Sequence, residues 1–179
     1  MRDAQEKSKR LETLGDDEVL EELNGLFTKG VKFVEPSDLS GSLKGRDNLY
    51  NHLDMMIREA EKSVTIVTTA EGLNRKMEAL MPSFEEAKKR KIKIRIAAPI
   101  DSNNIEVARE LKKVAEVKKL ENIKARFMIV DSNQLMLMLL DDEKFHPNYD
   151  IGVWINTEFL AQALEQFFEL AWKDMKAVR

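Results

Sequence analysis

Short apolar stretches alternate along this sequence with longer segments of helical spacing, and the alternation constrains the fold more than any other feature. Residues 64–68 are all β-branched and uncharged, which is typical of a buried strand. Residues 92–96 alternate isoleucine with basic residues and predict a second strand that ends before Pro99. Helices are predicted around these strands, over 47–62, 71–90 (broken or kinked at Pro82) and 101–115. The order predicts an α/β protein.

The later part of the chain predicts a meander closed by a helix. Strands are expected over 123–130, Gln134–Leu140 and Ile151–Ile155, followed by a helix over 157–176. The short segment Asp131–Asn133 predicts a hairpin between the first two of these strands. Gln134–Leu140 is apolar on both faces, so it should lie inside the sheet. Together these elements predict a mixed β-sheet covered by helices.

A separate helical segment is expected over residues 1–30, ahead of a domain over 31–179. Leucines and one phenylalanine give the segment an apolar stripe, at Leu11, Leu14, Leu20, Leu23 and Phe27. Short helices are marginal without packing partners, so this stripe either lies on the domain or pairs with a second copy of the chain. Residues 30–46 hold glycines, serines and Pro36, which predicts a connector with at most a short strand at Val31–Val34.

Composition excludes several classes of protein. The sequence has no cysteine and only two histidines, His52 and His146, neither with a second ligand at metal spacing, so we expect no metal site and no cofactor. The longest uncharged stretch, Ser132–Leu140, is far shorter than the about 20 residues of a membrane span, and no signal peptide follows Met1. A cytoplasmic protein without a membrane segment is therefore predicted.

The sequence shows no clear binding site for nucleotides or nucleic acid. It contains no glycine-rich phosphate-binding motif. Its net charge is −3, whereas a DNA-binding domain usually carries a basic excess on one face. The densest basic run, Lys88–Lys91 followed by Lys93 and Arg95, has no aromatic residues for base stacking. We interpret it as a solvated helix end and the outer face of a strand.

The third predicted strand carries the most informative pattern. In it Lys124 and Arg126 precede an apolar run that ends at Asp131. This spacing resembles the His-x-Lys-x-x-x-x-Asp signature of the phospholipase D superfamily, in which the histidine is the nucleophile, the lysine holds a phosphoryl oxygen and the aspartate is mainly structural. Lys124 takes the place of the histidine, and a protonated lysine is a poor nucleophile at a phosphorus atom. The resemblance implies the fold without its chemistry.

A wider set of segments extends this resemblance. Lys44–Leu49, Ala60–Ile66, Lys91–Ile96, Met128–Asp131 and Phe167–Trp172 follow one another in the order seen in one family. They resemble the effector-sensing domain of archaeal TrmB-type transcription regulators, whose phospholipase D-like domain is catalytically inactive. In that family a winged helix-turn-helix and a helical dimerisation segment come first. The resemblance implies a homodimer that contacts DNA only through a winged helix not present in these 179 residues.

Any ligand pocket should lie at the carboxyl ends of the parallel strands. Candidate residues are those that follow the first two strands and those at the degenerate signature: Thr68, Thr69, Glu71, Asp101, Ser102, Lys124 and Arg126. Lys124 and Arg126 lie one pleat apart, so both cations should face the pocket, balanced by solvent, by a nearby carboxylate such as Asp101 or Glu71, or by a bound anion. We therefore expect a small anionic or polyhydroxylated, sugar-like effector.

Two rival functions remain open on sequence alone. One is a divergent phosphodiesterase or nuclease that assembles its site across a dimer, although the missing histidine argues against it. The other is an assembly module without a pocket, whose helices bind another protein.

Overall fold

The computed structural model describes residues 25, 35–121 and 124–178. The chain divides into two units, Met1–Glu35 and Pro36–Arg179, and the fold below is that of the second unit. The expected dimerisation residues and the expected strand at Val31–Val34 lie outside the described residues, so both stay predictions.

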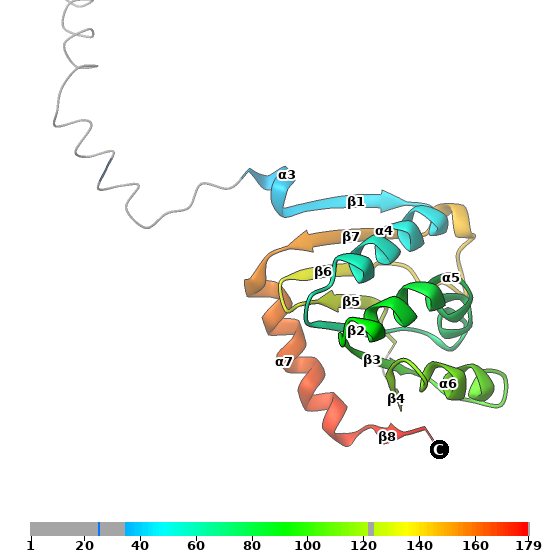
Figure 1. The fold of residues 1–179 in the computed structure, drawn as a ribbon. Helices are drawn as coiled ribbons and strands as arrows, with labels where there is room; N and C mark the ends of the chain where they lie inside the picture. Colours follow the sequence, from blue (N-terminus) through cyan, green and yellow to red (C-terminus); the bar gives the residue numbers. More distant parts are fainter. Residues whose placement is uncertain (1–24, 26–34, 122–123, 179) are drawn as a thin grey trace, which may run out of the picture. The chain divides into compact units, whose positions relative to one another are not determined.

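One mixed sheet forms the centre of the second unit (Figure 1). In spatial order its strands are β1, β7, β6, β5, β2, β3, β4 and β8. Parallel pairing joins β2 to β3 and β3 to β4, whereas every other pair is antiparallel. The bounds are β1 Ser40–Lys44, β2 Ser63–Val67, β3 Lys93–Ala98, β4 Glu116–Lys119, β5 Phe127–Val130, β6 Gln134–Met138, β7 Ile151–Asn156 and β8 Lys176–Ala177.

Helices cover both faces of this sheet. Their bounds are α3 Pro36–Leu39, α4 Arg46–Glu59, α5 Ala70–Lys89, α6 Ile105–Leu111 and α7 Glu158–Asp174, with a 3₁₀ turn η1 at Pro147–Tyr149. Figure 1 shows α4, α5 and α6 on one face and α7 on the other. The larger apolar core lies under α4 and α5, with Leu49, Leu53 and Phe84 fully buried against the sheet. The predicted α/β class and mixed, helix-covered sheet are confirmed.

Several predicted boundaries are wrong. The expected connector over 30–46 contains α3 and the edge strand β1, whose Ser-Gly-Ser sequence has no strand signature and which forms because it pairs with β7. Gly41 lies so close to the Trp154 indole that a Cβ there would come within 2.7 Å of the ring. No break occurs at Pro82, since α5 runs through it. The third expected strand begins only at Phe127, and β4 and β8 were not predicted.

Asp131 fixes the junction between α4 and β2. Its carboxylate accepts hydrogen bonds from the backbone N–H groups of Glu61, Lys62 and Ser63 at 2.7–2.8 Å. The residue itself adopts φ = 53° in the β5–β6 turn. The structural role implied for the signature aspartate fits this geometry.

The opposite face of the sheet is held by a buried ion pair. Arg95 is buried, and its guanidinium contacts Glu165 at 3.2 Å and also Glu169, both on α7. It also lies 5.0 Å from the Phe168 ring centroid. The interpretation of Arg95 as a solvated outer-face residue is therefore wrong, because α7 lies over that part of β3.

Arg90, within the basic run, holds the end of a neighbouring helix. Its guanidinium donates to the carbonyl oxygens of Ala60 at 2.6 Å and Ile57 at 2.9 Å, at the carboxyl end of α4. Cations in this position satisfy carbonyl groups that a helix leaves unpaired. The expectation of a solvated helix end is therefore wrong at Arg90, whose guanidinium makes part-buried hydrogen bonds to the end of α4 rather than contacting its own helix.

Candidate functional site

A cavity of about 350 Å³ opens at the carboxyl ends of β2 and β3. Because β5 is antiparallel to β2, the residues that lead into β5 come to the same end of the sheet. The segment after β6 reaches this place as well, since β5 and β6 form a hairpin. The lining residues are Thr68, Thr69, Ala70, Pro99, Lys124, Ala125, Arg126, Met138, Leu139, Leu140, Asp141 and Glu143. Such an apolar cavity with a few polar groups is typical of small-molecule sites.

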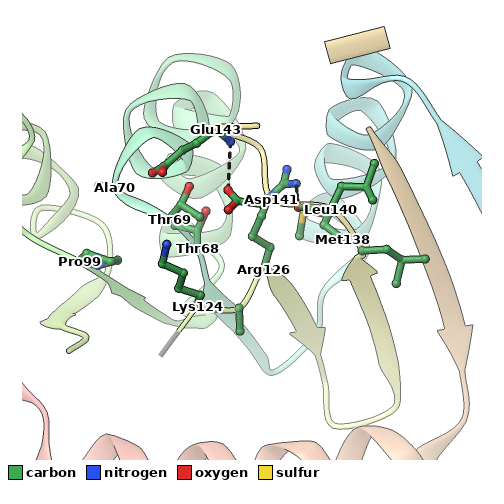
Figure 2. A pocket seen from close by; sticks show the side chains of 12 residues that line it. Thr68, Thr69, Ala70, Pro99, Lys124, Arg126, Met138, Leu140, Asp141 and Glu143 are labelled. Carbon is green, nitrogen blue, oxygen red and sulfur yellow. Dashed lines mark hydrogen bonds between the residues drawn. The ribbon is translucent and has the colours of Figure 1, made fainter. Parts of the chain in front are cut away.

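Five polar side chains line the cavity besides Arg126. Lys124 extends toward the hydroxyl-bearing side chains of Thr68 and Thr69 (Figure 2). Asp141 and Glu143 add two carboxylates. The Asp141 carboxylate accepts a hydrogen bond from the Glu143 backbone N–H at 3.2 Å, which together with Lys144 and Lys124 holds the pKa of Asp141 below its ordinary value. The wall thus carries both signs of charge.

Arg126 lines the cavity but is already paired. Its guanidinium donates two hydrogen bonds to the Asp150 carboxylate, at 2.9 and 2.8 Å, and one to the Leu140 carbonyl oxygen at 2.7 Å. Only 5% of the residue is exposed. Burial alone would raise the pKa of Asp150, but Arg126 and Arg46 outweigh burial and lower it. Arg126 is therefore held in an internal ion pair.

Asp142 forms the second anionic centre behind the cavity. It accepts hydrogen bonds from the Thr69 hydroxyl at 3.0 and 3.1 Å, pairs with Arg75, and lies 3.6 Å from the Arg126 Nε. Arg46 then links the two carboxylate segments, reaching Asp150 at 3.3 Å and the Asp142 carbonyl oxygen at 3.3 Å. The expected nearby carboxylate is therefore found at Arg126, but it is supplied by Asp142 and Asp150 and not by Asp101 or Glu71.

Lys76 is a buried amine one layer below the cavity. Its Nζ donates to the Thr68 hydroxyl at 3.0 Å and lies 5.3 Å from the Tyr50 ring centroid. Burial, reinforced by the charge of Arg126, lowers the pKa of Lys76 from 10.5 to about 7 despite the nearby carboxylates. Gly72 permits this packing, because a Cβ there would collide with the Thr68 hydroxyl. The hydroxyl of Thr68 therefore joins the cavity wall to a titratable group beneath it.

The cavity brings together four of the seven predicted ligand residues: Thr68, Thr69, Lys124 and Arg126. Glu71 is exposed on α5 and lies 3.7 Å from Arg75. Asp101 and Ser102 line a different depression, of about 660 Å³, beside β8. In addition, Asp101 accepts a hydrogen bond from the Asn103 N–H at 2.7 Å, a local turn contact. Both the cavity and this second depression lie at carboxyl ends of parallel strands, so the strand-end rule alone does not distinguish them.

Sequence reasoning missed the segment 138–143 and the buried charges Lys76, Asp142 and Asp150. A signal for Asp142 exists in the acidic loop after β6, where Asp141, Asp142 and Glu143 are consecutive. Lys76 has no comparable signal, because an isolated lysine on a helix is ordinarily exposed.

Neither histidine reaches the cavity. His52 stacks on Trp154, with ring centroids 6.4 Å apart, and burial lowers its pKa. The His146 Nδ1 accepts a hydrogen bond from the Asn148 N–H at 3.2 Å. Within the described residues, no group of three His, Cys, Asp or Glu side chains could hold a metal ion. In the same part of the chain, no helix is long and apolar enough to cross a bilayer.

The fold belongs to the phospholipase D-like class. Among solved structures, Nuc of Salmonella typhimurium, a phospholipase D family member, is similar with a TM-score of 0.61 and 15% identity, over 78% of this chain and 99% of that one. NucT of Helicobacter pylori gives 0.60 and 15%, over 77% and 98%. The predicted fold class is confirmed.

The family model for the transcriptional regulator TrmB, EBD N-terminal subdomain, matches residues 42–179. The chain therefore belongs to the TrmB family, as the sequence resemblance predicts. A similar solved structure is that of TrmBL2, an archaeal chromatin protein with a novel mode of DNA binding, with a TM-score of 0.60 and 18% identity over 99% of this chain and 68% of that one. No curated protein matches the chain in sequence.

Proposed function

We propose that this chain is a non-catalytic effector-sensing and dimerisation domain of a TrmB-like transcription regulator. The observation that carries the proposal is the state of Arg126, which lines the cavity but pairs with Asp150. At the neighbouring signature position stands Lys124 where a phosphodiesterase has its nucleophilic histidine. The cavity thus corresponds in position to a phosphodiesterase active site. It contains no histidine, however, and the cation at the phosphate-binding position is already paired with a carboxylate.

The charges on the wall favour a polyhydroxylated, sugar-like effector over an anion. Lys124 is opposed by Asp141 and Glu143, and Arg126 is neutralised by Asp150. A phosphorylated ligand would meet these two carboxylates, whereas hydroxyl groups of a neutral ligand can both donate to carboxylates and accept from Lys124. The apolar residues Pro99, Met138 and Leu140 can cover the less polar ring faces.

The effector would act by changing how two such domains pack. Its differential affinity for two arrangements supplies the switching free energy, typically about 1–3 kcal/mol. In this proposal residues 10–30 join two copies, and the winged helix of such a regulator contacts DNA. Replacing Leu20 and Leu23 with glutamate should weaken the dimer in light scattering, and an unchanged dimer would remove this function from the segment.

The binding experiment uses isothermal calorimetry on the full chain with neutral di- and monosaccharides and with their phosphate esters. Binding of a neutral sugar that is lost in Lys124→Ala and kept in the control Lys93→Ala, an exposed lysine of β3, supports the proposal. Preferential binding of the phosphate esters would contradict the charge argument.

The hydrolysis experiment tests the rival enzyme function. The unmodified chain should leave bis(p-nitrophenyl) phosphate and DNA uncleaved, and Lys124→His combined with Arg126→Lys should not readily create turnover because Asp150 still pairs with residue 126. Hydrolysis by the unmodified chain that disappears in Lys124→Ala would establish a phosphodiesterase instead.

A further inference from the structure

The outer side of α7 is apolar and exposed. Phe159 is 86% exposed, Phe167 69%, Leu170 63% and Leu160 40%. At 100° per residue these four positions, with Ala163, occupy one continuous side of the helix. We call this set the α7 stripe.

The same helix already uses another side to bind the sheet. Ala161, Phe168 and Trp172 are buried there. The apolar arc of α7 is therefore wider than its contact with the sheet requires. Within the described residues α7 is also the only helix on its face of the sheet (Figure 1), so no other described helix covers the stripe. Contiguous exposed apolar surface of this kind marks an interaction site.

We propose that the α7 stripe is a homodimer interface, in which α7 of one copy packs antiparallel against α7 of a second copy about a two-fold axis. This contact goes beyond the proposed function, which joins two copies through residues 10–30. It requires nothing from that segment.

Charge distribution favours a second copy of this apolar helix as the partner. From Phe159 to Leu170 the acidic residues of the central turns, Glu165 and Glu169, are drawn toward Arg95 on the sheet side. The exposed residues that border the stripe there are the uncharged Gln162 and Gln166. Two copies can therefore meet along this length without facing like charges, whereas DNA or an anionic surface would find no cation on it.

The antiparallel arrangement matches apolar residues at the two ends of the stripe. Its midpoint lies between residues 164 and 165, so Phe159 of one copy comes level with Leu170 of the other. The exposed Asp174 comes level with Ile155, just ahead of the opposite α7, whose first turn carries Glu158. The match is therefore between apolar side chains and not between opposite charges.

The available area suits a dimer contact. A buried aromatic side chain covers about 150–250 Å², so the exposed parts of Phe159 and Phe167 amount to roughly 300 Å² per copy. Both copies together supply about half of the roughly 1,200 Å² of a small specific interface. Leu160, Ala163 and Leu170 extend the same surface.

The test uses the full chain and the absence of native cysteine. Ala163→Cys lies near the proposed two-fold axis, so a short bismaleimide should join two copies efficiently. Glu85→Cys, on the exposed side of α5, is the matched control and should stay monomeric on denaturing gels. In a chain in which Leu20 and Leu23 are already replaced by glutamate, adding Phe167→Asp should abolish the cross-link and raise the dimer dissociation constant at least about 30-fold in analytical ultracentrifugation, as for a central interface residue.

A second control separates this interface from other effects. Phe145→Asp changes an exposed phenylalanine elsewhere and should leave both cross-linking and dissociation constant unchanged. Because Phe167 is exposed, its variant should keep the circular dichroism of the native fold. The cross-link should also persist when Leu20 and Leu23 are replaced by glutamate, which distinguishes it from the dimer of the proposed function. A full chain that remains monomeric, or a chain with Leu20 and Leu23 replaced by glutamate that dimerises equally well with Phe167→Asp, would overturn the α7 interface.

Discussion

Replacing the buried Lys76 with methionine tests whether a titratable amine lies beneath the candidate cavity. Methionine preserves an unbranched side chain and removes the ionisable group. In the native protein the pKa of Lys76 falls to about 7, whereas the unfolded chain returns it to 10.5. Between these two values the unfolded chain binds more protons than the folded one, so the free energy of unfolding must rise with pH in this window.

The magnitude follows from the same two pKa values. Below pH 7 the lysine is protonated in both states and its burial penalty is constant. Between pH 7 and pH 9, linkage gives a gain in stability of about 2 kcal/mol from this group alone. The gain continues with decreasing slope until the lysine of the unfolded chain also loses its proton.

The assay is urea denaturation of the native chain and of Lys76→Met at a series of pH values from about 6 to 9, which covers the lower part of the window between the two pKa values. The stability difference, native minus variant, should increase by about 2 kcal/mol between pH 7 and pH 9. Lys89→Met, an exposed position of the same helix, should follow the native curve in parallel. Parallel curves for the native chain and Lys76→Met would refute the reasoning, because they would show that Lys76 keeps its proton equally in both states.

Three further changes test the ion pairs and caps of the fold by chemical denaturation. Arg126→Met should destabilise the chain by about 3–5 kcal/mol, because Asp150 is left buried without its main partner. The double variant with Asp150→Leu should recover much of this loss, and equal losses in the single and double variants would argue against the pair. Asp131→Ala removes the acceptor of three backbone hydrogen bonds and should cost about 2–3 kcal/mol, while a neutral result would mean that water replaces it. Trp172→Ala should cost about 3–5 kcal/mol by opening the contact between α7 and the sheet, and a loss below about 1 kcal/mol would show that α7 adds little stability.

The alternation of apolar runs and helical segments was sufficient to predict the central strands. In β2 and β3 the apolar residues are locally continuous or strictly alternating, so their burial is visible in the sequence. β1 is different, because Ser40–Lys44 has no local strand preference and becomes a strand only by pairing with β7. Arg95 shows the same limit, since its burial depends on α7, 70 residues further along the chain.

The candidate site was also predictable only in part. Thr68 and Thr69 directly follow β2, so the rule for parallel strand ends places them correctly. Asp101 also follows a parallel strand, but its segment turns toward β8. The partner of Arg126 could not be inferred, because Asp150 lies 24 residues away and reaches it only through the hairpin and the loop that follows.

The order of strands in the sheet has a consequence for how the chain is made. β1 is the first strand among the described residues, yet its partner is β7, with Ser40 level with Ile155. At the other edge, β4 pairs with β8 near the carboxyl end of the chain. During synthesis both edges must therefore wait for residues beyond Ile151, which makes completion of the sheet a late event with large loop-closure entropy. A chain released before Ile151 is made would keep open strand edges that favour aggregation, so the yield of native protein should depend on translation beyond this residue.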